Sequence, residues 1–128
     1  MDNGQLKELV DELLKHGKEL SWLEFKRNDA TDNQCLGKYI SGLANAANVA
    51  HELFGYLIFG IDNKTLDVVG SNFNYSNRKE KGAELDFYIR RNMTSYAGFE
   101  YFICDYDGKQ VEIFQIPAAG TTPIAFEN

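Results

Sequence analysis

Four residues of this chain have the types and spacing that chemistry on a phosphate ester would need: Glu19, Glu24, Lys26 and Asp62. The two glutamates lie five positions apart, which places their side chains on opposite faces of a strand and well apart around a helix. They can converge only if the backbone bends between them. We therefore expect a loop over residues 18–21 that leads directly into a strand.

Three carboxylates at one rim would suit a divalent cation. Asp62 is expected to end the neighbouring strand, where it can join Glu19 and Glu24. Carboxylate oxygens are good ligands for Mg²⁺ or Mn²⁺, which can activate water and neutralise charge on a phosphodiester. Lys26 would share a strand face with Glu24 and could hold a phosphate oxygen. We predict the three carboxylates as metal ligands and, together with Lys26, as catalytic residues.

The same residues have a simpler interpretation. Glutamates beside lysines on the outer face of a strand usually form solvated pairs that contribute little, and an aspartate after a strand usually forms a turn. The cofactor prediction is therefore Mg²⁺ or Mn²⁺, with no cofactor as the alternative.

The charge of the chain limits how it could meet a polyanion. A formal net charge of −6 and an isoelectric point near 4.8 argue against nonspecific attraction of the whole surface to nucleic acid. Basic residues are nevertheless concentrated locally, since residues 76–91 carry a net charge of +2. The candidate phosphate contacts, each of which is also explained as solvated surface charge, are Lys26, Arg27, Arg78, Lys79, Lys81, Arg90 and Arg91.

Apolar periodicity predicts three helices. Residues 4–16 carry leucine and valine at helical spacing, with Gly17 as the expected stop. Residues 34–50 form a second stripe behind an Asp-Asn pair at 32–33, which has good N-cap types. A third stripe covers residues 79–96.

Alternation and apolar runs predict five strands. Residues 21–28 alternate, with Leu23 and Phe25 on the core face, and residues 55–61 form a central strand covered on both faces. Residues 66–70 are expected to pair with that central strand as a hairpin. Two further strands lie within residues 99–117, around the turn signal Asp107-Gly108.

This order of elements indicates an α+β fold, with a mixed, largely antiparallel sheet made of hairpins and packed by about three helices. The length suits a single domain over residues 1–128. The last loop, rich in proline, glycine and threonine, leads into the short apolar run 124–126. We therefore expect the chain to be a fragment of a longer protein.

Cysteine usage and hydropathy indicate a cytoplasmic protein without membrane segments. Cys35 and Cys104 have no metal-ligand spacing and are expected to be buried free thiols. The two histidines, His16 and His51, stand alone, so no paired zinc ligands are visible. No apolar stretch is long enough to span a bilayer, and the N-terminus has no signal-peptide pattern.

Four sequence blocks together resemble the Schlafen-type AlbA-like domain. The blocks are E-x4-E-F-K at 19–26, Y-I-S-G-L-A-N at 39–45, G-Y-L-I-F-G-I-D at 55–62 and V-V-G at 68–70. The resemblance extends from about Glu19 to Pro123. Each block alone is weak, but four in order with suitable gaps are fairly specific.

The resemblance implies an α+β fold with a role in nucleic-acid binding. Such domains occur in bacterial and archaeal proteins described as DNA-binding or as transcriptional regulators, often joined to helicase-related or winged-helix parts, and in animal Schlafen proteins. In the Schlafen members that cleave RNA, a three-carboxylate metal site falls at the positions of Glu19, Glu24 and Asp62. This chain departs from the family in lacking a Gly-Gly pair after Asn45 and a Y-I-R motif at its end.

Three functional hypotheses remain open. The leading one is a module that binds DNA or RNA in a larger transcriptional regulator or helicase-related protein. The second is a metal-dependent endoribonuclease, and the third is a protein-interaction or dimerisation domain, with a homodimer as partner. The four tyrosines that could stack on bases are Tyr75, Tyr96, Tyr101 and Tyr106, although most aromatic residues of a small domain belong to its core.

Overall fold

The computed structural model describes residues 1–27, 32–94 and 98–127. In chain order the elements are α1 (Asn3–Leu14), β1 (Leu23–Lys26), α2 (Asn33–Val49), β2 (Phe54–Phe59), the 3₁₀ helix η1 (Tyr75–Asn77), β3 (Lys79–Glu80), β4 (Ala83–Glu84), α3 (Leu85–Arg91), β5 (Glu100–Tyr106) and β6 (Lys109–Pro117). A four-stranded sheet has the order β1-β2-β6-β5, with β1 and β2 parallel and the other pairs antiparallel. The predicted α+β class is confirmed.

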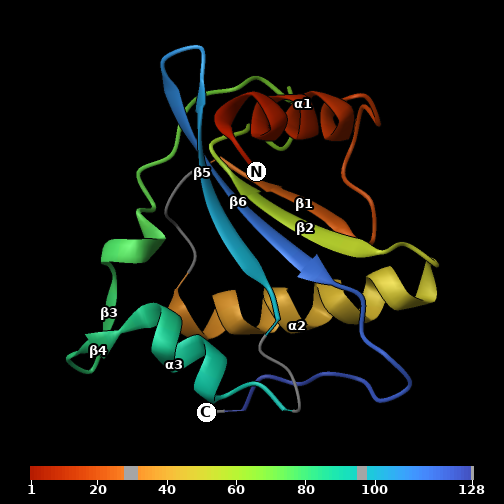
Figure 1. Cartoon of the computed structure of the whole chain (residues 1–128), viewed down its shortest axis with the longest axis vertical. Coiled ribbons are helices and arrows are strands. Elements are labelled where there is room, and N and C mark those ends of the chain that lie inside the picture. Colours follow the sequence, from red (N-terminus) through yellow and green to blue (C-terminus); the bar gives the residue numbers. More distant parts are fainter. Residues whose placement is uncertain (28–31, 95–97, 128) are drawn as a thin grey trace.

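The sheet separates two apolar cores. Helix α1 covers one face, and α2 with α3 lies on the other (Figure 1). Strand alternation sends Phe25 and Ile58 to the α1 side, while Leu57 and Phe114 pack with α2. The face that carries Glu24 and Lys26 on β1 is therefore the α2 side of the sheet, because Glu24 is the neighbour of Leu57 in the parallel register.

Both long helices begin at a capping residue, and for α2 this is the Asp32 that the sequence indicates. Asp2 and Gln5 form a capping box at α1, and the Asp32 carboxylate accepts a hydrogen bond from the Cys35 N–H at 2.8 Å. Gly17, with φ of 73°, adopts the left-handed conformation that ends the first helical segment. Among the described residues, no helix is long and apolar enough to cross a membrane.

A glycine in β2 lets α2 approach the sheet closely. A Cβ atom added to Gly55 would lie 2.6 Å from the backbone oxygen of Leu43. Real side chains do not tolerate that contact with backbone, so helix α2 sits at a distance that only glycine in β2 permits. This close packing fixes α2, and with it Tyr39, relative to β1 and β2.

The predicted helix over residues 79–96 is too long at both ends, since α3 covers only Leu85–Arg91. Residues 79–84 form the β3–β4 hairpin, and α3 begins only at Leu85. At the hairpin tip Lys81 and Gly82 both have positive φ, 51° and 83°, as a two-residue primed turn requires. Such residues cannot continue a right-handed helix. The end of the predicted helix, at residues 95–96, lies outside the described residues.

The predicted hairpin between residues 55–61 and 66–70 is also wrong. Residues 66–70 form no strand: one isolated bridge, between Ile61 and Val68, and hydrogen bonds from the Val69 and Gly70 N–H groups to the Gly60 carbonyl oxygen join the two segments. Both edges of β2 are already taken, by β1 on one side and by β6 on the other. The hairpin predicted around Asp107-Gly108 is confirmed as β5 and β6.

The two cysteines differ in their surroundings. Cys104 is a free, buried thiol as expected, but Cys35 is exposed, which corrects the prediction that both are buried. Cys35 lies in the first turn of α2, where its thiol contacts the Asp32 carboxylate at 3.5 Å. The pKa of the Cys35 thiol is raised, mainly because of that hydrogen bond.

Candidate functional site

The bend expected before the first strand is present. Leu20 and Leu23 exchange backbone hydrogen bonds of 3.0 and 3.1 Å, which folds the chain back just before β1. Glu19 is thereby carried alongside β1, and its Oε2 atom accepts a hydrogen bond from the Phe25 N–H at 2.8 Å. Because β1 lies at the edge of the sheet, this N–H has no strand partner, and Glu19 supplies the acceptor.

Glu24 lies beside Glu19, so the two glutamates converge. Burial raises the pKa of Glu24 to about 7, and a hydrogen bond to the Glu19 carboxyl adds to this, whereas the Lys26 ammonium opposes it. Two carboxyl groups at close range resist simultaneous ionisation. Glu24 can therefore take up or release a proton near neutral pH, a property that a general acid requires.

Lys26 is held against helix α2 and does not extend freely into solvent. Its Nζ atom donates a hydrogen bond to the Tyr39 hydroxyl at 2.7 Å and lies 4.2 Å from the centre of the Tyr39 ring. A pocket of about 280 Å³ next to this contact is lined by Cys35, Lys38 and Tyr39. Lys38, an exposed cation that the sequence-based selection did not include, lies on the same side of α2.

Asp62 is engaged elsewhere. Its carboxylate accepts hydrogen bonds from the backbone N–H groups of Lys64 and Thr65 at 2.8 and 2.9 Å, and Arg27 pairs with it at 3.2 Å. The N–H groups of Thr65 and Lys64 are the main cause that holds the pKa of Asp62 below its ordinary value. Asp62 thus forms the turn that the simpler interpretation gave it.

The described residues do not assemble the predicted metal site. Within residues 1–27, 32–94 and 98–127, no three side chains of His, Cys, Asp or Glu are grouped so that they could hold a metal ion. The structure brings Glu19 and Glu24 together but does not add Asp62 to them. The described side chains therefore do not form the three-carboxylate set for Mg²⁺ or Mn²⁺.

Two of the predicted phosphate-binding arginines are used inside the fold. Arg78 donates from Nε to the Phe73 carbonyl oxygen at 2.7 Å, with its guanidinium 4.2 Å from the centre of the Phe73 ring. Arg90 pairs through Nε with both carboxylate oxygens of Asp86 at 3.0 Å and stacks on Phe99 at 3.8 Å. Both arginines are half-buried, and they fasten η1 and α3 to the core.

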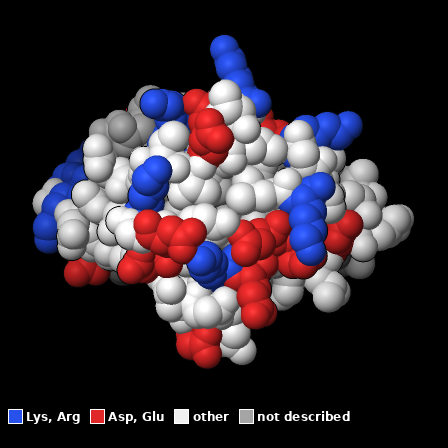
Figure 2. Space-filling model, turned by 90° about the horizontal axis from the view of Figure 1, so that it is seen from above, with Lys and Arg blue, Asp and Glu red and all other residues white. Residues whose placement is uncertain are grey.

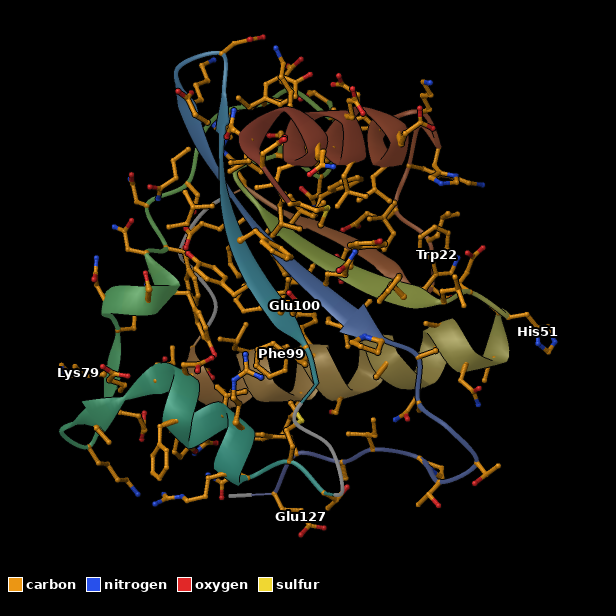
Figure 3. All side chains as sticks on the ribbon, viewed as in Figure 1. Trp22, His51, Lys79, Phe99, Glu100 and Glu127 are labelled. Carbon is orange, nitrogen blue, oxygen red and sulfur yellow. The ribbon has the colours of Figure 1, made fainter. Side chains whose placement is uncertain are left out.

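Three further predicted cations are exposed: Lys79 on β3, Lys81 in the β3–β4 turn and Arg91 at the end of α3. The hairpin and α3 pack together. We call these three residues the basic corner. Figure 3 shows Lys79 at the outer edge of the molecule, whereas Phe99 lies inside it. Asn33, at the start of α2, donates to the Lys79 carbonyl oxygen and to Glu80, which ties the hairpin to α2.

The face over α1 has a different character. Figure 2 shows acidic and basic side chains interspersed there. Ion pairs on this side join Lys7 to Asp107 at 2.6 Å and Lys15 to Glu12 at 2.7 Å. Mixed charge of this kind gives no extended positive field, so the α1 face is a poor site for a polyanion.

Comparison with known proteins places the chain in a family. The family model described as Schlafen, AlbA_2 matches residues 19–128. The chain belongs to the Schlafen AlbA_2 family. The match begins at Glu19, the first residue of the blocks that carried the resemblance. A search of curated proteins found no match to the AlbA_2 chain.

Two solved structures share the fold of this AlbA_2 domain. The N-terminal domain of a protein from Nitrosomonas europaea, described as related to the ATP-dependent DNA helicase RecG, has a TM-score of 0.62 at 18% identity, with 95% of this chain and 80% of that chain covered. The DIP2311 protein from Corynebacterium diphtheriae has a TM-score of 0.58 at 16% identity, with 95% and 24% covered. This AlbA_2 chain thus spans about a quarter of the Corynebacterium protein.

A buried glutamate of the AlbA_2 domain escaped the sequence analysis. Glu112 lies in the middle of β6, is fully buried, and accepts hydrogen bonds from the N–H groups of Asn74 and Tyr75, each at 2.9 Å. The hydroxyls of Ser71 and Tyr101 also donate to it. A single glutamate in the apolar run V-E-I-F was the available signal. Glu112 positions residues 71–77, which lead into β3 and the basic corner.

Replacing Glu24 by glutamine is expected to stabilise the domain at high pH. Glu24 binds its proton more tightly in the folded state, because its pKa rises from 4.5 to about 7. Its contribution to stability is therefore complete below pH 4.5 and is lost as the pH rises through 7. After allowance for solvent screening, we expect Glu24→Gln to gain about 1 kcal/mol at pH 8 relative to pH 5, measured by urea unfolding.

The control is Glu100→Gln, which changes an exposed glutamate on β5. This control is expected to show no such difference between the two pH values. An equal effect of Glu24→Gln at pH 5 and pH 8 would mean that the fold does not raise the pKa of Glu24.

Proposed function

We propose that this AlbA_2 domain binds nucleic acid, DNA or RNA, as one module of a larger regulatory or helicase-related protein. The observation that carries the proposal is the basic corner. Among the described residues, no ion pair joins Lys79, Lys81 or Arg91 to an acidic side chain. All three cations are therefore available to phosphate groups.

The acidic remainder of the domain makes such binding local. Lys and Arg side chains bind phosphates mainly by releasing condensed counterions, and this gain depends on the contacts made and not on the overall charge. Lys38 is a further exposed cation on α2, the helix that Asn33 ties to the hairpin. The related helicase-like protein from Nitrosomonas europaea agrees with this assignment, although at 18% identity the likeness concerns the fold.

The test is direct binding of the 128-residue chain to labelled single-stranded and double-stranded DNA and RNA, followed by fluorescence anisotropy. Three phosphate contacts predict that log K falls with log salt with a slope of roughly −2 to −3. No binding of any of these ligands at about 50 mM salt would refute the proposal.

The Glu19–Glu24 pair favours a second candidate, the cleavage of RNA by the endoribonuclease activity that the family resemblance suggests. Two carboxyl groups, one of which takes up a proton near neutral pH, are a minimal set for acid–base chemistry. Because the described carboxylates do not form a three-ligand metal set, this candidate predicts cleavage of RNA that persists when divalent ions are removed with a chelator and is lost in Glu24→Gln. Cleavage that persists in the variant would assign the activity to another site or to a contaminant.

A further inference from the structure

Helix α3 presents an aromatic ring to solvent beside the basic corner. The Phe87 side chain is 55% exposed, whereas every other Phe, Tyr or Trp among the described residues is buried or half-buried. Arg91 lies one helical turn further on, with its guanidinium 5.4 Å from the centre of the Phe87 ring. The ring therefore stands next to a cation and does not belong to an apolar patch.

The tyrosines that the sequence suggested for base stacking are occupied in other ways. Tyr75 is buried and donates to Asp86 at 2.7 Å, and Tyr106 is half-buried and donates to Asp11. Tyr101 donates to Glu112, and burial together with this hydrogen bond raises the pKa of Tyr101. Tyr96 lies outside the described residues. None of the three described tyrosines offers a freely exposed ring.

We propose that the basic corner binds single-stranded nucleic acid and that an unpaired base stacks on Phe87. The inference rests on the proposed function, because it names which nucleic acid the basic corner prefers. Every base has a π-face that can stack on a phenyl ring, but in a duplex both faces are covered by neighbouring base pairs. Arg91 contacts the ring, and Lys79 and Lys81 lie on the β3–β4 hairpin that packs against the same helix, so the cations of the basic corner match the charge of the backbone that carries such a base.

Phe87 replacements test this inference in the full chain. The ligands are a labelled oligothymidylate of about twelve nucleotides and a duplex of the same length. Phe87→Ala is expected to weaken single-strand binding by about 5- to 150-fold and to leave duplex binding unchanged. Phe87→Leu, which keeps an apolar side chain without a π-face, should behave like the alanine variant, whereas Phe87→Trp should bind like the wild type or more tightly.

Controls separate this inference from the proposed function. Leu53→Ala removes another strongly exposed apolar side chain, 81% exposed and remote in sequence, and should change nothing. If the wild type binds but Phe87→Ala binds the single strand equally well, the stacking inference is overturned and the proposed function stands. If the wild type binds neither ligand, the stacking inference is overturned, and the proposed function is refuted as well only if the RNA ligands of the direct binding test also fail to bind. An equal loss of single-strand and duplex binding in Phe87→Ala would also overturn the stacking inference, since it would indicate a change in the basic corner as a whole.

Discussion

Simultaneous replacement of Lys79, Lys81 and Arg91 by alanine is expected to weaken nucleic-acid binding by roughly 10- to 100-fold at low salt. The three side chains are exposed on the β3–β4 hairpin and α3, so their truncation leaves the core intact. Each lost phosphate contact should also flatten the salt dependence by about one unit of slope. Anisotropy titrations over a range of salt concentrations measure both quantities.

The matched control removes the same charge from the other face of the molecule. Lys7, Lys15 and Lys18 lie on α1 or just after it, where acidic and basic groups are mixed (Figure 2). Their replacement by alanine gives the same net charge as the basic-corner variant. If both triple variants lose binding equally, the effect comes from net charge, and the basic corner is not the contact surface.

Glu112→Ala is expected to destabilise the fold by about 3 kcal/mol or more. The substitution leaves the N–H groups of Asn74 and Tyr75 without their acceptor in the protein interior. It also removes the acceptor of two hydroxyl groups and opens a cavity under the loop over residues 71–77. Because a domain of this size has a total stability of about 5–15 kcal/mol, the loss would be large.

Urea unfolding monitored by circular dichroism measures this loss. Glu100→Ala, at an exposed position on the neighbouring strand β5, is the control and should change the free energy of unfolding by about 0.5 kcal/mol at most. Glu112→Gln should lie between the two, because its amide retains one acceptor oxygen but turns an N–H₂ group towards donors. A Glu112→Ala protein as stable as the Glu100→Ala protein would show that Glu112 does not hold the loop.

Local sequence signals determined the long helices and the last hairpin. The apolar stripes of α1 and α2, the cap at Asp32 and the turn at Asp107-Gly108 each act over a few residues, so their pattern suffices. The short spacing of Glu19 and Glu24 likewise demanded a bend, and the turn that closes between Leu20 and Leu23 provides it. The sequence blocks also carried enough information to identify the Schlafen AlbA_2 family.

The partners of individual charged groups were decided only by the tertiary structure. Asp62 and Arg27 are 35 residues apart in the chain, and Glu112 accepts from Tyr75, 37 residues earlier. The two strands that pair with β2, β1 and β6, were likewise decided by the tertiary structure. The sequence by itself therefore determined the elements, the family and which residues carry charge. Folding determined which charges remain free for a ligand, because burial and long-range hydrogen bonds depend on contacts that no local pattern encodes.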